Sequence, residues 1–432
     1  MWILRRMIVD QLPAAVGGAG EGSHRAPASG PSLRWLAGVV SALAISACQT
    51  LPNDPGREPI SDERLLSGVA VFGETVSSAE VPEASILDSN EAMRTFVDPR
   101  IRTGGTSVTR AARLLRKLVE NGYFERGYER HLTQTAADTF ATKAGNCLSF
   151  TNLFVALARM ARLEARYQVV DVPPSFDSDL GLLFRNTHIN VLVPNADIRG
   201  AGRGDLTVDF NRVDTENYRR QLVSDRYAAG LFYNNLSVNH WRGGDNRKAF
   251  AYLAKALQTY SGNPDLWVNL GAFYSKHGAY EHALAAHYRA LRIDGRSRPA
   301  MAGLAAAYAG LGDMELSDAF TRRVEHYRRR NPYYHYALAQ VAYQDDDYVG
   351  ALASVELALA LKRDDHRFHY LKSLAQWQLG DRMQARESLV RAERFANQQH
   401  TKRRYARMAE AIAANEVPES LAGAPAAQSS GS

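Results

Sequence analysis

The feature that most constrains the fold is a period of 34 residues in the second half of the chain. A turn residue recurs at this interval, followed five positions later by a small residue. The turn residues are Gly244, Gly278, Gly312, Asp346 and Gly380, and the small residues are Ala249, Ala283, Ser317, Ala351 and Ala385. Self-similarity at this spacing is typical of stacked helix pairs, because small residues let the two helices of a pair approach closely.

The helix before each turn also carries leucine at the same interval, at Leu236, Leu270, Leu304 and Leu338. The arrangement resembles the tetratricopeptide-repeat family. It predicts an all-α solenoid of about five helix pairs over residues 228–415, with a polar capping helix at 401–413 and a disordered tail over 416–432. The third repeat departs from the pattern at Ser317 and Glu325, and the fifth at Lys372.

A solenoid of this kind presents a concave surface to a protein or peptide partner. The candidate partner-binding residues lie on the first helix of each repeat: Asn235, Asn239, Asn269, Tyr274, Tyr308 and Tyr343. The alternative is that the tyrosines are packing residues of the repeats. His366 and His369 share a helix face, but no third ligand lies near them in the sequence, so we expect no metal site.

A second feature is the segment Gly145-Asn-Cys-Leu-Ser-Phe150, which precedes a run with apolar residues at helical spacing, ending at Ala161. Asn146 or a neighbouring residue can cap this helix, because short polar side chains satisfy the free N–H groups of a first turn. Cys147 therefore stands at the positive end of the helix dipole. This position predicts a lowered thiol pKa and a more available thiolate.

Two strand-like runs follow, at 186–193 and 206–210. If they are neighbours, His188 of the first run can face Asp209 of the second. The order is then Cys147 as nucleophile, His188 as base and Asp209 as the carboxylate that orients the base. Asp205 and Asp214 compete with Asp209 for the last role.

These residues resemble the transglutaminase-like superfamily of papain-type thiol enzymes, over residues 86–225. The resemblance implies an α+β domain, taken as 86–227, whose catalytic residues are Cys147, His188 and Asp209, with no cofactor. It also implies an oxyanion hole that uses the Cys147 backbone N–H and a second, upstream donor, for which Gln134 is a candidate. A domain that keeps the motif without activity is the alternative.

The N-terminal region reads as an export signal. Thirteen uncharged residues, from Trp35 to Ala47, follow Arg34 and end before Cys48. This run is too short to span a bilayer, which needs about 20 residues. The ending Ile-Ser-Ala-Cys resembles a bacterial lipoprotein signal over 1–47, which implies lipidation of Cys48, with palmitate-type chains, and an outer-membrane location facing the periplasm. An uncleaved apolar anchor is the alternative. The proline-bearing stretch 48–85 predicts a flexible tether.

The formal net charge of +6 is small and spread over mixed Arg and Glu or Asp runs, so it does not indicate nucleic-acid binding. The leading hypothesis is a membrane-tethered thiol peptidase or amidase with a partner-binding solenoid. An amine in place of water as acceptor would make it a transglutaminase-like acyl transferase. The alternative hypothesis is a non-enzymatic envelope scaffold that acts through its repeats.

Overall fold

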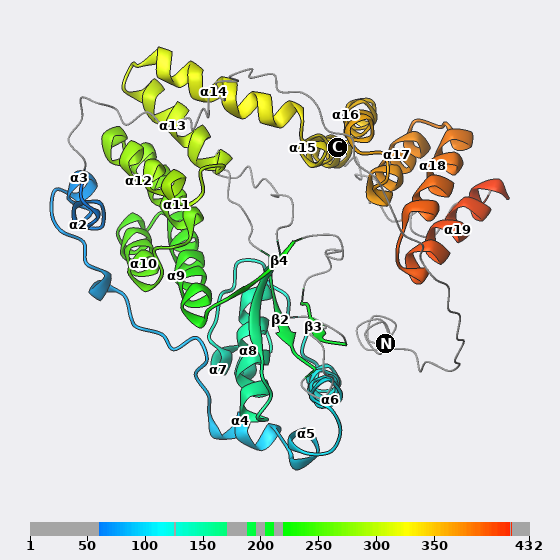
Figure 1. Cartoon of the computed structure of the whole chain (residues 1–432), viewed down its shortest axis with the longest axis horizontal. Helices are drawn as coiled ribbons and strands as arrows, with labels where there is room; N and C mark the ends of the chain where they lie inside the picture. The colour runs from blue at the N-terminus through cyan, green and yellow to red at the C-terminus, as the bar shows by residue number, and fades with distance from the viewer. Residues whose placement is uncertain are drawn as a thin grey trace, which may run out of the picture.

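The computed structural model describes residues 60–124, 127–170, 188–195, 204–210, 219–414 and 416. After an N-terminal segment, residues 60–85, an α+β domain precedes an array of paired helices (Figure 1). The first domain contains the helices α4 (Glu91–Phe96), α5 (Pro99–Arg102), α6 (Ser107–Glu120), α7 (Ala136–Thr142) and α8 (Cys147–Met160). Its strands are β1 (Arg166–Val170), β2 (His188–Val193), β3 (Leu206–Val208) and β4 (Arg220–Val223).

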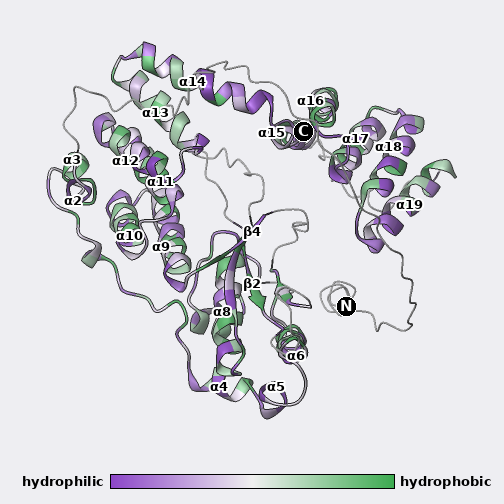
Figure 2. Cartoon of the chain, in the orientation of Figure 1, coloured by the Kyte–Doolittle hydropathy of each residue, from purple (hydrophilic) through white to green (hydrophobic). Residues whose placement is uncertain are grey.

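The four strands form one antiparallel sheet in the order β3-β2-β1-β4. Val191 of β2 stands opposite Val208 of β3, which confirms the predicted pairing of these two strands. Strand β2 is buried at five of its six residues, and Figure 2 shows its hydrophobic character. A strand buried on both faces reads as a continuous apolar run, as the segment Ile-Asn-Val-Leu-Val does with one polar interruption.

Helix α8 forms the centre of this domain. Every residue from Leu148 to Ala158 is buried. Helix α6 covers the same core with its apolar face, which includes Leu114 and Leu118. It begins at the predicted cap, since the Thr106 side chain accepts from the Thr109 N–H at 3.1 Å. The hydrophobic spacing of both helices thus determines which faces enter the core.

The helical array consists of pairs with the predicted period. The helices are α9 (Asp225–Arg242), α10 (Asn246–Thr259), α11 (Pro264–Lys276), α12 (Tyr280–Ile293), α13 (Arg298–Gly310), α14 (Met314–Arg329), α15 (Pro332–Gln344), α16 (Tyr348–Leu361), α17 (His366–Gln378), α18 (Arg382–Phe395) and α19 (Gln399–Ala413). Each of the five periodic turn residues has a positive φ, between 61° and 83°. Glycine suits four of these turns because it adopts this conformation without a steric cost, and Asp346 is the exception at 61°.

The stack of helix pairs has more than one core. One hydrophobic core runs from the α+β domain through the first repeats to Phe320 of α14, whereas α15 to α17 and α18 to α19 form two separate clusters. Helix α15 buries only Ala339, and its Leu338 and Val341 are 42% and 49% exposed. The last turns of α14 are hydrophilic (Figure 2), as expected from Glu325 and the arginines that follow. The departures of the third repeat therefore coincide with a loosening of the stack.

The flexible tether predicted for 48–85 is wrong for residues 60–85, which form the N-terminal strap. This strap contains α2 (Asp62–Leu65), α3 (Val69–Phe72) and a 3-10 helix, η1 (Ser78–Glu80). Leu65 and Val76 are fully buried, and the Phe72 ring lies 5.8 Å from that of Phe250 on α10. Figure 1 shows the strap running beside α12 and α10 before it enters the α+β domain. Apolar burial of this kind outweighs the disorder suggested by the prolines.

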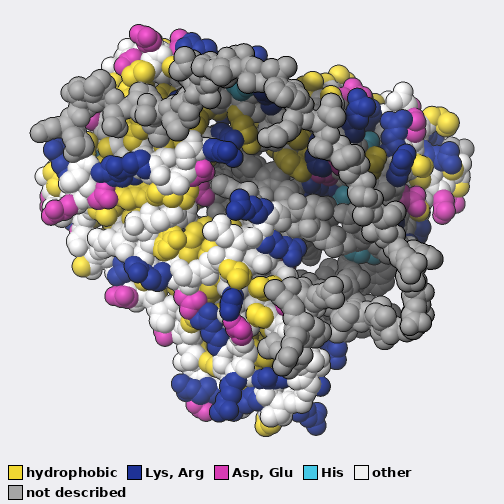
Figure 3. Space-filling model, viewed as in Figure 1, with side chains coloured by type: hydrophobic (Ala, Val, Ile, Leu, Met, Phe, Trp, Pro, Cys, Tyr) yellow, Lys and Arg dark blue, Asp and Glu magenta, His cyan; other side chains and the backbone are white. Residues whose placement is uncertain are grey.

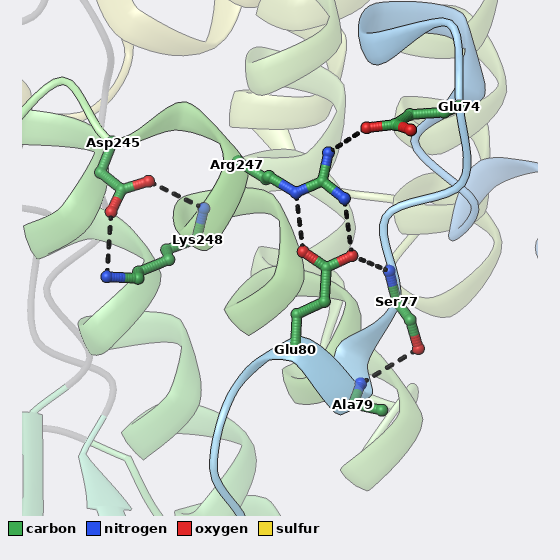
Figure 4. Close-up of polar contacts among 7 residues, drawn as sticks. All are labelled: Glu74, Ser77, Ala79, Glu80, Asp245, Arg247 and Lys248. Atoms are coloured by element: carbon green, nitrogen blue, oxygen red, sulfur yellow. Dashed lines mark hydrogen bonds and ion pairs between the residues drawn. The ribbon is translucent and has the colours of Figure 1, made fainter.

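Polar contacts hold the middle of the strap to α10 (Figure 4). Arg247 donates two hydrogen bonds to the Glu80 carboxylate, at 2.7 and 3.0 Å, and pairs with Glu74 at 2.5 Å. The same Glu80 accepts from the Ser77 N–H at 3.1 Å, which closes a capping box at η1. Arg247 lowers the pKa of Glu80, mainly through these hydrogen bonds.

We predict that Arg247→Gln loosens the strap, because it removes the paired hydrogen bonds to Glu80. Cleavage by a glutamyl endopeptidase at Glu74, Glu80 and Glu83 should become about two- to fivefold faster, as measured by mass spectrometry of the fragments. Lys248→Gln is the matched control. Among the described residues Lys248 forms an ion pair with Asp245, three residues earlier in the chain, and none with the strap. Equal cleavage rates in the two variants would contradict the prediction.

One buried ionisable group stands out in the repeats. His287 of α12 is 1% exposed, and neither ring nitrogen has a hydrogen-bond partner among the described residues. The ring fits between Gly271 of α11 and Gly303 of α13, where an added Cβ would lie 2.5 and 2.2 Å from it. Burial lowers the pKa of His287 to about 4, from an ordinary value of 6.5.

This pKa shift predicts that the repeats lose stability in mild acid. Between pH 6.5 and 4 the unfolded chain binds a proton at His287 that the folded chain does not, so the free energy of unfolding falls as the pH falls, by about 3 kcal/mol in total. His287→Leu should remove this part of the pH dependence in urea unfolding followed by circular dichroism. Parallel pH curves for the variant and the original chain would refute the assignment.

Candidate active site

The site is built around the first turn of α8. Cys147 is its first residue, and Asn146 is its N-cap, whose side chain accepts from the Ser149 N–H at 3.0 Å. This confirms the cap predicted from the sequence. The Asn146 amide also donates to Thr133 at 2.7 Å, so the cap is held by the loop before α7.

Ser149 ties the same turn to the same loop. Its hydroxyl accepts from the Gln134 N–H at 2.9 Å and lies 3.2 Å from the Leu132 carbonyl oxygen. Gly145 must be glycine here, because a Cβ at its φ of 153° would lie 2.6 Å from the Ser149 Cβ. Gln134, the candidate oxyanion donor, lies beside the start of α8, and its side-chain oxygen accepts from the Thr142 hydroxyl at 2.9 Å. Its oxyanion role stays a prediction.

The structure brings the two other candidate residues into contact. His188 opens β2, Asp209 follows β3, and the His188 Nε2 lies 2.6 Å from the Asp209 Oδ2. His188 is buried, so this pair is shielded from water. Of the competing carboxylates, Asp205 accepts from the Asn195 N–H at 2.9 Å and thereby has a structural role. Asp214 lies outside the described residues.

Asn190 is a site residue that we did not propose from the sequence. It lies two residues after His188, on the same face of β2, and its amide donates to the Asp209 Oδ2 at 3.1 Å. The carboxylate is thus held by the imidazole and by an amide together. The two-residue strand period was the signal that could have identified Asn190, because it places residues 188 and 190 on one face.

Cys147 lies towards the His188 end of β2. Thr151, one helical turn after Cys147, has its hydroxyl 3.5 Å from the carbonyl oxygen of Ile189, the neighbour of His188. The charge on Asp209 also acts on the Cys147 thiol. The nucleophile candidate, the imidazole and the carboxylate therefore occupy one neighbourhood.

The electrostatics differ from the sequence expectation. We predicted a lowered thiol pKa from the helix dipole, but burial raises the pKa of Cys147 to about 11, and the negative charge of Asp209 adds to this effect. The backbone N–H groups of Cys147 and Leu148 do lower the pKa, yet their effect is smaller. The prediction is wrong because burial costs the thiolate more hydration free energy than the N-terminus of one helix supplies in electrostatic stabilisation.

Tyr128 is a second residue that the sequence did not reveal. Its backbone forms a bridge with Gly145, and its side chain is 46% exposed. Burial raises the pKa of this phenol, and the charges of Cys147 and Asp209 raise it further, which puts the phenol close to the site. No local pattern marks this position, since it depends on two loops meeting.

The candidate partner-binding residues have varied surroundings. Tyr274 and Tyr308 are fully buried; the Tyr274 hydroxyl donates to the Leu65 carbonyl at 2.6 Å, and the Tyr308 hydroxyl lies 2.9 Å from that of Tyr288. These two tyrosines are packing residues, as the alternative interpretation held. Of the others, Asn239 donates to the His131 carbonyl, Asn269 donates to Asn234 at 2.7 Å, and Asn235 and Tyr343 are half-buried.

Comparison with known protein families identifies the first domain. Residues 94–192 match the transglutaminase-like superfamily. The match includes Cys147 and His188 and ends before Asp209. No curated protein sequence matches this chain.

Among solved structures, the helical repeats are similar to MamA from Desulfovibrio magneticus RS-1, at 16% identity over 40% of this chain and 96% of that one, with a TM-score of 0.23. YrrB, described as a tetratricopeptide protein with an unusual peptide-binding site, is similar at 15% identity over 42% and 94% of the two chains, with a TM-score of 0.23. PilF from Pseudomonas aeruginosa is similar at 17% identity over 46% of this chain and 90% of that one, with a TM-score of 0.24. TM-scores this low carry no conclusion beyond the likeness itself.

The family match, the antiparallel sheet and the paired helices with a 34-residue period agree on the architecture. This chain carries a transglutaminase-like domain followed by tetratricopeptide-type helical repeats.

Proposed function

We propose that the chain is a thiol acyl-transfer enzyme that cleaves a peptide or amide bond. The Cys147 sulfur attacks the carbonyl carbon and forms a carbon–sulfur bond, while its proton passes to His188. The protonated imidazole then gives this proton to the leaving amine as the carbon–nitrogen bond breaks. Water hydrolyses the resulting thioester and restores the thiol; an amine acceptor would give transamidation instead.

The observation that carries the proposal is the partly buried hydrogen bond between His188 and Asp209. A carboxylate on Nε2 holds the imidazole in one tautomer and orientation, and it stabilises the imidazolium that forms during attack. The remaining ring nitrogen, Nδ1, is the one that exchanges the proton with Cys147 in this mechanism. Asn190 assists by keeping the Asp209 oxygen in place.

The raised pKa of Cys147 shapes the resting state. A thiol with a pKa of about 11 is protonated at pH 7, so the thiolate forms only together with a protonated His188. The attraction between the two ions then offsets the desolvation of the sulfur. The same raised pKa favours the second candidate function, a non-enzymatic scaffold whose Cys147 is an inert buried thiol.

Reactivity as a function of pH separates these candidates. In a Cys48→Ser chain Cys147 is the only thiol. If His188 takes the proton, Cys147 of this chain should react with iodoacetamide at pH 6.5 at least roughly tenfold faster than in a variant that also carries His188→Gln. The rate of the His188→Gln variant should rise about tenfold per pH unit up to about pH 11. Coincident pH curves for the two chains would favour the scaffold.

We further predict that Asp209→Asn lowers the turnover of a model amide substrate by at least about 100-fold, because the imidazolium loses its carboxylate partner. Asp205→Asn is the matched control. That residue lies near the same strand, and an amide oxygen can still accept the Asn195 N–H, so activity should stay within about twofold. Equal losses in both variants would remove Asp209 from the mechanism.

We propose that the repeats bind a protein or peptide partner, and that Cys48 carries the lipid that places the chain in the bacterial cell envelope. Cys48 lies outside the described residues, and within the described ones no helix has the length and apolarity to cross a bilayer. The lipoprotein-type ending at Ala47-Cys48 supports the anchor.

Replacing the anchor residue tests this part of the proposal. Cys48→Ser should abolish incorporation of a palmitate analogue and release the chain from membranes in a flotation gradient, because lipid chains supply the membrane affinity. Cys147→Ser should float like the original chain. A Cys48→Ser chain that still floats would show that another segment makes the attachment.

A further inference from the structure

The net charge of the chain is not spread evenly, contrary to our expectation from the sequence. The 24 residues from Arg94 to Lys117 contain seven basic residues and one acidic residue, which gives a formal charge of +6. This equals the net charge of the whole chain, so the remaining residues balance to zero. The segment covers the end of α4, all of α5 and most of α6 in the α+β domain.

The fold gathers six of these basic side chains on one surface, the basic patch. Figure 3 shows Lys and Arg side chains, in dark blue, over the lower end of the molecule, where Figure 1 places α4, α5 and α6. Four of the six side chains are exposed and two are half-buried. The basic patch consists of Arg94, Arg100, Arg102, Arg110, Arg113 and Arg116.

Backbone contacts hold the basic patch together. Gly104 and Gly105 have φ angles of 78° and 99° in the turn that lays α5 against α6. Across this turn Arg113 donates to the Arg100 carbonyl oxygen at 3.2 Å, and Arg110 donates to a carbonyl oxygen of α5 at 3.0 Å. A carbonyl group has no net charge, so these contacts fix the arginines in place without neutralising them.

Few carboxylates offset the basic patch. Asp98 is the one acidic residue inside the segment, and it pairs with Lys117 at 2.8 Å. Arg94 pairs with Glu91 at 3.0 Å in an exposed contact, a kind that contributes little free energy. The other five arginines of the patch form no ion pair with the described residues. Like charges at close range repel one another, so an anionic partner would stabilise this surface.

The form of the basic patch favours an array of anions as its partner. Its side chains come from three helices, so several of them can engage separate phosphate groups at once, and the arginine guanidinium group suits phosphate oxygens. Among residues 91–117, all of which the structure describes, no aromatic side chain is exposed on which a nucleic-acid base could stack. The headgroups of a lipid bilayer supply many phosphates and require no stacking.

We propose that the basic patch binds the phosphate groups of anionic lipids and holds the α+β domain against a membrane surface. The proposed lipid anchor brings the chain to such a surface, so the choice of partner rests on that part of the proposed function. The anchor would join the folded chain beside the second repeat, where Arg289 pairs with Asp62. The basic patch lies on the other domain. Two contacts on separate domains define an orientation that a single point of attachment does not.

Vesicle sedimentation tests the proposal with the full chain carrying Cys48→Ser, which removes the lipidation site. The vesicles contain phosphatidylcholine alone or with about 30% phosphatidylglycerol, so that only the second kind is anionic. We expect the anionic lipid to raise the partition coefficient at least about tenfold at low salt. Salt at about 0.5 M should remove this gain, because it screens the charges. Equal binding to both kinds of vesicle would reveal an apolar attachment and overturn the proposal.

Charge variants locate the contact. The double variant Arg100→Gln, Arg102→Gln should bind anionic vesicles at least about tenfold more weakly, because two exposed charges of the patch are lost. The matched control, Arg322→Gln, Arg386→Gln, changes the net charge equally at exposed positions of α14 and α18. Circular dichroism checks that each variant is folded. The same loss of binding in both folded variants would show an effect of net charge alone and remove the patch from the contact.

A fluorophore reports which surface meets the lipid. An environment-sensitive nitrobenzoxadiazole group is attached at Thr103→Cys beside the patch, or at Thr321→Cys on α14, in chains that also carry Cys48→Ser and Cys147→Ser. Both threonines are exposed. On anionic vesicles the emission at position 103 should increase and shift to shorter wavelength, whereas the emission at position 321 should not change. A response at position 321 alone, or equally at both positions, contradicts the proposed orientation.

A soluble polyanion distinguishes lipid from an acidic protein partner. Poly-glutamate should bind the Cys48→Ser chain more weakly than anionic vesicles do, and tight binding of poly-glutamate without vesicle binding would overturn the lipid proposal. Flotation of the Cys48→Ser chain at about 0.5 M salt measures the anchor without the basic patch. Alkylation of Cys147 measures the thiol site. The three proposals can therefore fail separately.

Discussion

The burial of α8 is the constraint on which the α+β domain depends. Its residues from Leu148 to Ala158 are buried, and Ser149, Thr151 and Asn152 are polar. A buried polar group is costly unless it is hydrogen-bonded, so these side chains determine what can pack around the helix. The Ser149 hydroxyl accepts a hydrogen bond from the loop at residues 132–134, and the Thr151 hydroxyl faces the Ile189 carbonyl. Asn152 accepts from the Tyr167 hydroxyl at 2.7 Å. These contacts hold β1, β2 and the loop against α8, although the Asn152 Nδ2 has no hydrogen-bond partner among the described residues.

The other end of α8 connects the domain to the repeats. Arg159 makes paired contacts to Asp225, at 2.5 and 2.8 Å, and Asp225 opens α9 directly after β4. The strap adds a second connection, because the Tyr233 hydroxyl of α9 accepts from the Ala84 N–H at 2.9 Å. The first repeats and the α+β domain therefore share one hydrophobic core, and the later repeats have their own. Helices α15 to α19 thus pack in clusters separate from the core that contains α8.

Local patterns predicted the elements that repeat or have short-range causes. The period of 34 predicted the helix pairs and their turns, and Asn146 predicted the start of α8. The strand-like runs at His188 and before Asp209 are strands, and they pair as the triad hypothesis required. The rest depends on tertiary packing. The raised pKa of Cys147 comes from the burial of the sulfur and the nearby Asp209 charge, and the order of the strap comes from its contacts with α10 to α12. Asp346 shows the limit of pattern alone, since it adopts the turn conformation of the glycines without being one.

The strap also limits how far a lipid anchor could hold the site from a membrane. If Cys48 is lipidated, only the eleven residues 49–59 separate it from the first described residue, Ile60. The distance from Cys48 to Ile60 is then at most about 40 Å with the chain fully extended. A free tether through residue 85 would reach about three times as far. Because Arg289 pairs with Asp62, the point of attachment would be the second repeat rather than the α+β domain. The repeats would then position the catalytic domain relative to the membrane. Its substrate would have to lie within the distance from the membrane that this short linker permits.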